Sequence, residues 1–233
     1  MFERFKQRSY ELEDIDTGNY TPEEYESCIS ELQLVNRWMG DAHALKQTLL
    51  KDVEQNALRE FSVLDVGAGS GELLRVSASW ARETGRRFQG VGLEINKRSV
   101  VAIREESAKF PEIDAVRGDA LRLPFAGDDF DYVMCSLFTH HFIDEHVVRI
   151  LREMSRVARR RIFVIDLHRD PVPYFFYTTL GKLVLKNRLL RHDGALSILR
   201  SFKANELLNL GQAAGLRNVA VEHHFPARLV LTA

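Results

Sequence analysis

Cysteine and long apolar runs are scarce in this chain of 233 residues. The two cysteines, Cys28 and Cys135, form no Cys-x-x-Cys pair, so neither a disulfide framework nor a metal site is predicted. No apolar run reaches the roughly 18 residues that a membrane-spanning helix needs. The first residues also lack the apolar core of a signal peptide. We therefore expect no transmembrane segment and a location in the reducing cytoplasm.

Net charge is low as well, at −1, which gives no reason to expect nucleic acid as a partner. The charge is unevenly distributed, because residues 1–60 carry a net −6 and residues 142–233 a net +7. Two explanations stay open: the two ends attract each other across a cleft, or each is a solvated face. There is no internal repeat and no low-complexity segment, and the length predicts one domain with an appended lid.

From residue 61 onward, apolar runs that predict strands alternate with helical patterns. The expected strands are 61–66, 89–95, 113–116, 131–136 and 161–167, separated by helices at 72–83, 97–109 and 144–158. Alternation at this spacing predicts a parallel sheet with helices on both faces, an α/β fold. A helix at 203–214 and strands near 217–223 and 228–232 complete the pattern. The short turn around Pro226 makes the last two strands antiparallel.

Two segments lie outside this alternation. Thr21-Pro22-Glu23-Glu24 is a capping box that begins a helix, and a second helix is expected at 42–55. The segment 170–202 is rich in aromatic and basic residues and predicts one or two inserted helices. We therefore expect an N-terminal helical lid over 1–58 and a ligand-binding domain over 59–233 that carries the insert.

The loop after the first strand is the strongest functional signal. Residues 63–72 read Val-Leu-Asp-Val-Gly-Ala-Gly-Ser-Gly-Glu, with glycines at alternate positions between an apolar run and a helix. Glycines let a ligand approach the backbone closely and allow positive φ angles. The spacing Gly-x-Gly-x-Gly differs from the Gly-x-Gly-x-x-Gly of dinucleotide enzymes, which disfavours an NAD(P)-dependent oxidoreductase.

Carboxylates follow the next two strands, at the edge where open α/β sheets bind ligands. Glu94 can accept both hydrogen bonds of a ribose diol, and Asp119 suits the exocyclic amine of adenine. The sequence after the fourth strand, Cys135-Ser136-Leu137-Phe138, is not the Asn/Asp-Pro-Pro-Tyr/Phe motif of nucleic-acid amino methylation. A DNA or RNA base is therefore disfavoured as substrate.

Together these motifs resemble the class I S-adenosylmethionine-dependent methyltransferases. The matching residues are 63–71, Gly-Leu-Glu-Ile at 92–95, Gly-Asp-Ala at 118–120 and Leu-Pro-Phe-Ala-Gly-Asp-Asp-Phe-Asp-Tyr-Val at 123–133. The closest subgroup is the ubiquinone/menaquinone-biosynthesis type with its small-molecule relatives. The resemblance implies a Rossmann-like, mostly parallel sheet of seven strands with a reversed last strand. Where such enzymes often have a Lys-Pro-Gly-Gly turn, this chain has Ala158-Arg159-Arg160-Arg161, which we interpret as a positively charged helix C-terminus.

The resemblance also implies S-adenosyl-L-methionine as cofactor and S-adenosyl-L-homocysteine as product. The residues expected around the cofactor are Asp65, Gly67, Ala68, Gly69, Gly71, Glu94, Ile95, Asp119, Ala120 and Cys135. Arg37, on the first helix, is a further candidate that could reach the carboxylate of the cofactor.

Methyl transfer from a sulfonium is an in-line displacement, so the enzyme mainly aligns the acceptor, excludes water and removes a proton. Histidine is the natural base near neutral pH. The catalytic candidates are His140 and His141, which follow the fourth strand, and His168, which follows the fifth. The alternative for the pair is that one of them begins the next helix and orders the loop.

The acceptor pocket is expected between the first helix and the insert, which together would cover the cofactor as a lid. The candidates are Trp38, Met39, Tyr174, Tyr177, Arg191 and His192. The leading hypothesis is O-methylation of a phenolic, polyketide-type or quinol-like small molecule of secondary metabolism, by a monomer or homodimer. C-methylation of an activated aromatic ring and a catalytically silent S-adenosylmethionine-binding partner protein remain alternatives.

Overall fold

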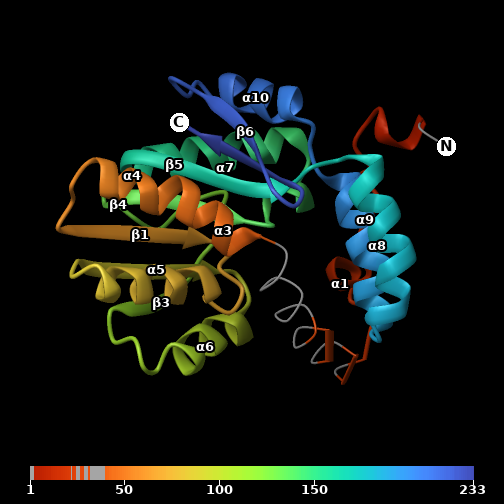
Figure 1. The fold of residues 1–233 in the computed structure, drawn as a ribbon, viewed down its shortest axis with the longest axis horizontal. Coiled ribbons are helices and arrows are strands. Elements are labelled where there is room, and N and C mark those ends of the chain that lie inside the picture. Colours follow the sequence, from red (N-terminus) through yellow and green to blue (C-terminus); the bar gives the residue numbers. More distant parts are fainter. Residues whose placement is uncertain (1–2, 22, 25–26, 29–30, 32–39) are drawn as a thin grey trace.

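A seven-stranded sheet forms the centre of the computed structural model, which describes residues 3–21, 23–24, 27–28, 31 and 40–233 (Figure 1). Its strands are β1 Glu60–Val66, β2 Arg87–Glu94, β3 Ile113–Arg117, β4 Phe130–Ser136, β5 Ala158–Leu167, β6 Ala220–His224 and β7 Arg228–Thr232. They are ordered β3-β2-β1-β4-β5-β7-β6. Strands β1 to β5 are parallel, whereas β7 is antiparallel to both β5 and β6. The predicted seven-stranded sheet with a reversed last strand is confirmed.

Helices cover both faces of the sheet, as the alternating pattern predicts. One face carries α3 Asp41–Leu45, η2 Lys46–Leu50, α4 Lys51–Gln55, α5 Glu72–Glu83 and α6 Lys97–Glu106, and the other carries α7 Asp144–Val157 and α10 Ala204–Ala213. Successive strand residues point to opposite faces. Val63 and Met134 therefore pack in the first core, while Leu64 and Val133 pack in the second.

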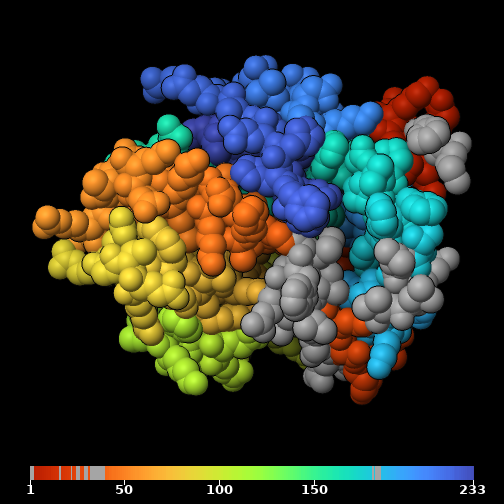
Figure 2. All heavy atoms as spheres, viewed as in Figure 1, coloured from red at the N-terminus to blue at the C-terminus, as the bar shows by residue number. Residues whose placement is uncertain are grey.

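The insert forms two helices, α8 Pro171–Val184 and α9 Arg188–Arg200, which lie beyond the carboxyl ends of the parallel strands (Figure 1). With the short helices η1 Glu3–Phe5 and α1 Asp14–Thr17 they occupy one end of the molecule (Figure 2). A separate buried cluster of Cys28, Leu185, Leu189 and Leu190 stabilises this end. No helix in the described parts of the chain is both long and apolar enough to cross a membrane.

Opposite charges of the two ends of the chain meet in the structure. Arg8 forms an ion pair with Asp144, and Asp14 lies 2.9 Å from Arg188. Deeper in the molecule, Asp41 at the start of α3 accepts two hydrogen bonds from Arg228 on β7, at 2.6 and 3.0 Å. Two of these pairs join an acidic side chain of residues 1–60 to a basic one of residues 142–233, whereas Arg8 and Asp144 pair in the opposite sense. Attraction between the ends remains one of the two explanations for the uneven charge.

The three arginines at 159–161 are a correction. We expected them at a helix C-terminus, but α7 ends at Val157 and they form the first part of β5. Arg159 and Arg160 lie 2.9 and 3.5 Å from the carboxylate of Asp131. Because this acidic neighbour on β4 compensates their charge, the exposed end of an extended strand accommodates them.

The lid boundary that we placed at 58/59 remains a prediction. Helices α3 and α4 nevertheless pack in the core of the sheet, through Ala44, Leu45 and Val53. The capping box before them is present, because Thr21 and Glu24 exchange backbone-to-side-chain hydrogen bonds of 3.0 and 3.2 Å. Of the predicted site residues, Arg37, Trp38 and Met39 lie outside the described residues.

Candidate active site

A cavity of about 400 Å³ opens at the carboxyl ends of the parallel strands. Its walls come from the loop after β1, the ends of β4 and β5, the N-terminal segment (residues 3–21) and α9. Ligand sites in open α/β sheets are expected at this edge, and the volume suits a ligand of nucleoside size. The cavity therefore lies where the sequence predicted a cofactor.

The glycine loop has the backbone conformations that its sequence predicts. Gly67, Gly69 and Gly71 have φ angles of +73°, +58° and +80°, in the region that favours glycine. A Cβ atom at Gly67 would lie 2.3 Å from the ring of Phe138, so no larger residue fits there. The amide of Gly69 donates a 2.7 Å hydrogen bond to the carboxylate of Glu94, which ties the loop to the end of β2.

Asp65 is a buried carboxylate that the protein itself leaves partly unsatisfied. Its side chain lines the cavity and is 2% exposed, and Oδ1 has no hydrogen-bond partner. Burial and, secondarily, the nearby Glu94 raise the pKa of Asp65 to about 8. Burial also raises the pKa of Glu94. A ligand that brings a positive charge and hydroxyl donors would satisfy both carboxylates.

His140 is the best-positioned base in the cavity wall. It lies in the short helix η3 Thr139–His141 after β4, is 3% exposed, and contacts the Asp166 carboxylate through Nδ1 at 2.6 Å. Asp166 also accepts hydrogen bonds from the hydroxyl of Thr139 at 2.5 Å and from the amide of His140 at 3.1 Å. Burial raises the pKa of Asp166, but the charge and hydrogen bond of His140 outweigh it and lower the pKa to about 2.

Part of this chain is similar to proteins of a known family. Residues 63–161 match the family model described as a methyltransferase domain, which includes the glycine loop, Glu94 and His140. These residues thus match a methyltransferase domain, and the similarities support a class I S-adenosylmethionine-dependent methyltransferase. An uncharacterized methyltransferase of Bacillus subtilis is 31% identical over 142 residues, which are 58% of this chain and 52% of that protein. The alignment thus spans about half of the length of that relative.

Two further similarities cover a larger part of this chain. A demethylmenaquinone methyltransferase of Bacillus licheniformis is 27% identical over 177 residues, 70% of this chain and 74% of that protein. The crystal structure of an S-adenosylmethionine-dependent methyltransferase from Aquifex aeolicus superposes with a TM-score of 0.60 at 16% identity, covering 86% of this chain and 96% of the other. At 16% identity, the similarity to the Aquifex aeolicus structure concerns the fold alone. S-adenosylmethionine carries a positive charge and ribose hydroxyls, so the orphaned Asp65 oxygen fits this methyltransferase cofactor.

The structure places six of the fourteen predicted cofactor and catalytic residues, and one predicted substrate residue, around the cavity. The predicted residues that line the cavity are Asp65, Gly67, Ala68, Gly69, His140, His141 and Tyr177. Glu94 contacts the loop through its hydrogen bond with the amide of Gly69. Gly71 directly precedes α5 and lies close to the side chain of Ile103. Ile95 is 65% exposed, and Asp119 is exposed and accepts a hydrogen bond from the amide of Leu121.

Other predicted residues lie elsewhere. Ala120 and Cys135 are buried in the core on the α7 side of the sheet, and burial raises the pKa of Cys135 well above its ordinary value. His168 contacts the ring of His223 on β6, away from the cavity, and burial followed by that histidine lowers its pKa. Tyr174 packs edge-to-face on Phe5.

Arg191 and His192 are exposed on α9 and do not line the cavity. A hydrogen bond from His192 to Asp193 raises the pKa of the imidazole, although its partial burial opposes that shift. The cavity is therefore lined by other residues of this helix, on its inward-facing side.

Several residues that line or support the cavity were not predicted from the sequence. Glu13, Asp41, Asp193 and Arg228 line it, and Asp166 holds His140. Asp166 gave a readable signal, because, like Asp65, it is an acidic residue at the end of an apolar strand. The others gave none, since each depends on contacts between distant parts of the chain.

Proposed function

We propose that this methyltransferase acts on a hydroxyl group of a phenolic, polyketide-type or quinol-like small molecule in the cytoplasm. The observation that carries this proposal is the buried His140–Asp166 pair in the wall of the cofactor cavity. A base is needed only where the acceptor must lose a proton, and a histidine held by a carboxylate is well suited to take it.

Asp65, Glu94 and the loop 67–71 would hold the cofactor, which supplies a methyl group on a sulfonium leaving group. The carboxylate of Asp166 accepts a hydrogen bond from Nδ1 of His140, so Nε2 is the ring nitrogen that can accept a proton. His140 would take the proton of the acceptor hydroxyl, whose oxygen would receive the methyl group that the bound cofactor supplies. The proton then leaves to solvent, so one proton is released for each methyl group transferred.

The part of the cavity beside His140 favours an apolar acceptor. It is formed by Cys28 and by side chains of the N-terminal segment, α8 and α9, which include Ile15, Tyr177, Leu190 and Ile198. The Tyr177 hydroxyl donates to the carbonyl of Leu190, so the ring rather than the hydroxyl is presented to a ligand. The similarity to a demethylmenaquinone methyltransferase supports a quinol-like acceptor as one member of this class.

A panel of phenols and quinols tests the proposal through the formation of S-adenosylhomocysteine. We expect His140→Ala to lower turnover at least about tenfold, because general-base catalysis contributes about this much or more. The affinity for S-adenosylmethionine, measured by calorimetric titration, should be unchanged. His146→Ala removes an exposed histidine of α7 and is the matched control. An unchanged rate in His140→Ala would exclude this base.

Product analysis separates the alternatives. Mass spectrometry and NMR of the product distinguish a methyl ether from a methylated ring carbon, and the latter would replace O-methylation by C-methylation. Cofactor binding without turnover on any acceptor would favour a catalytically silent partner protein. Tight binding of NAD in the same titration would argue against the assigned cofactor.

A further inference from the structure

We propose that Glu13, His140 and His141 form a binding site for a divalent transition metal, with Zn²⁺ as the best match. Occupation of this site would block methyl transfer. The inhibitory half of the inference rests on the proposed role of His140 as the base, whereas metal binding itself does not. The three residues come from the N-terminal segment and from η3, which are far apart in the sequence.

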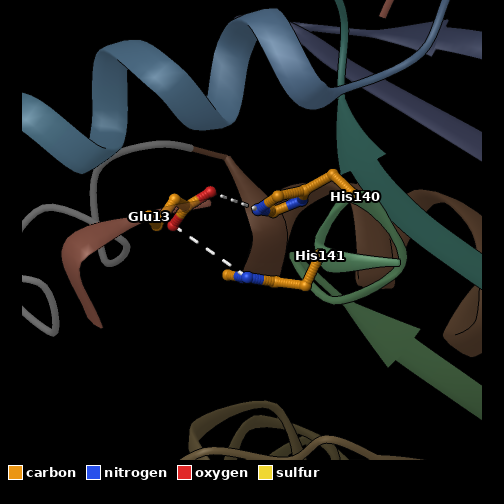
Figure 3. A group of neighbouring side chains, drawn as sticks. All are labelled: Glu13, His140 and His141. Carbon is orange, nitrogen blue, oxygen red and sulfur yellow. Dashed lines mark ion pairs between the residues drawn. The ribbon is translucent and has the colours of Figure 1, made fainter. Parts of the chain in front are cut away.

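The geometry is close to that of a metal site. Nε2 of His140 lies 4.0 Å from Oε1 of Glu13, and Nδ1 of His141 lies 4.0 Å from Oε2 of the same carboxylate (Figure 3). One ligand atom from each residue can be chosen so that all three lie within 4.8 Å of one another. Ligand atoms of a tetrahedral zinc ion are about 3.3 Å apart. A small movement of Glu13 toward the two imidazoles would therefore complete the site.

The surroundings of His140 support this assignment. Metal-binding histidines almost always donate their second ring N–H to a carboxylate or carbonyl group, which fixes the ring and strengthens the ligand. Asp166 provides such a carboxylate at 2.6 Å from Nδ1, which directs Nε2 toward Glu13. The hydroxyl of Thr139 fixes the same carboxylate from the other side.

The ligand set is that of a zinc ion with an open coordination position. Two histidines and one glutamate bind zinc in a known class of sites, where water or substrate is the fourth ligand. All three residues line the cavity, which supplies that position. Glu13 also accepts a hydrogen bond from Ser197 and lies 3.7 Å from Arg200, so a metal ion would share this carboxylate with them. Asp166 adds a second negative charge nearby.

A second cluster in the described residues, Asp14, His192 and Asp193, fits a metal less well. The carboxylate oxygens of Asp193 accept hydrogen bonds from the amides of Asp14 and Ile15, each at 3.0 Å. The imidazole of His192 is on the exposed surface of α9. The Asp193 carboxylate therefore already has a structural role and His192 is exposed, whereas Glu13 and His140 are both buried, so the cluster of Glu13, His140 and His141 is favoured.

Metal binding would prevent the proposed proton transfer. The lone pair of His140 Nε2 that would take the acceptor proton is the one that the metal would occupy. Zn²⁺ should therefore inhibit the methyltransferase, and a chelator should restore the activity fully.

The test uses the full-length protein loaded with S-adenosylhomocysteine and titrated with Zn²⁺ against a chelating dye. We expect one equivalent to bind, and Co²⁺ at the same site to give the visible absorption of a four- or five-coordinate ion. Glu13→Gln and His141→Asn should each weaken binding at least about tenfold, and Asp166→Asn should do so through His140. His146→Ala should bind as the wild type does, and His192→Ala tests the second cluster. A cooperative thermal unfolding transition, as in the wild type, shows that each variant is folded.

Absence of stoichiometric binding in the wild type would overturn the site, as would binding that survives Glu13→Gln and His141→Asn but is lost in His192→Ala. Binding that activates the enzyme would overturn the inhibitory half. No acceptor is present in the titration, so its result is independent of the proposed O-methylation. Inactivity toward phenols and quinols would contradict that function while leaving the metal site intact.

Discussion

At the scale of single residues, we expect Asp65 to lower the stability of the cofactor-free protein and to contribute to cofactor binding. We expect Asp65→Asn to stabilise the cofactor-free protein at pH 8, because burial of an ionised carboxylate carries a cost that a neutral amide avoids. The same substitution should weaken binding of S-adenosylmethionine, since it removes the negative charge that faces the cavity. Chemical denaturation and calorimetric titration measure the two effects.

The raised pKa of Asp65 also predicts how the stability of the folded protein changes with pH. The pKa of Asp65 is about 8 in the folded protein, and an unfolded aspartate has a pKa of about 3.9. The folded state therefore holds a proton that the unfolded state has lost, and this group makes stability fall as the pH rises from about 4 to about 8. The difference between wild type and Asp65→Asn should grow over that range. A difference that is independent of pH would contradict the assignment.

At the scale of elements, the loop after β1 allows a matched pair of glycine substitutions. Gly67 and Gly85 have φ angles of +73° and +66°, so alanine at either position costs about 1–2 kcal/mol of backbone strain. A Cβ atom at Gly85 would meet nothing within 4 Å, whereas at Gly67 it would meet Phe138. We expect both variants to be destabilised, but only Gly67→Ala to lose affinity for S-adenosylmethionine. Equal affinities in the two variants would contradict a role of the loop conformation, and of its packing on Phe138, in binding the cofactor.

The elements show how far the sequence predicts this molecule. The strands of the central sheet follow from short apolar runs and its helices from apolar residues at helical spacing, since each element buries the surface that its own sequence defines. The loop 67–71 and the carboxylates at the ends of strands are local signals, so the cofactor side of the site was predictable. The N-terminal segment has no such periodicity. Its order depends on distant partners, such as Arg8 with Asp144 and Asp193 with the amides of α1, which no local pattern reveals.

The same distinction explains the errors at the site. His141 was predicted because it follows the fourth strand, and Tyr177 because it belongs to the aromatic-rich insert; both line the cavity. Arg191 and His192 share α9 with residues that do line it, but they point outward. Nearly every turn of α9 carries both apolar and polar residues, so the sequence of this helix did not show which of its sides faces the cavity.

At the scale of the whole molecule, contacts between the two ends of the chain close the cavity. Arg200 of α9 donates hydrogen bonds to the carbonyls of His140 and His141, and to Glu11 in the N-terminal segment. The insert, the N-terminal segment and the loop after β4 are thus joined at one buried point. The acceptor side of the site forms only when these three parts meet, which separates it from the cofactor side that the sheet alone provides.

The buried pair of Asp41 and Arg228 should reveal this coupling of the ends. The two side chains are 6% and 1% exposed and join α3 to the reversed strand β7. Asp41→Ala leaves the arginine charge buried without its partner, so we expect a loss of about 3–5 kcal/mol in the free energy of unfolding. The double variant Asp41→Ala/Arg228→Leu should be more stable than Asp41→Ala, since it removes that charge. Arg87→Ala, which removes the exposed pair with Glu60, should leave stability unchanged in the same denaturant titration. If the double variant were less stable than Asp41→Ala, packing by the arginine rather than its charge would join the two ends.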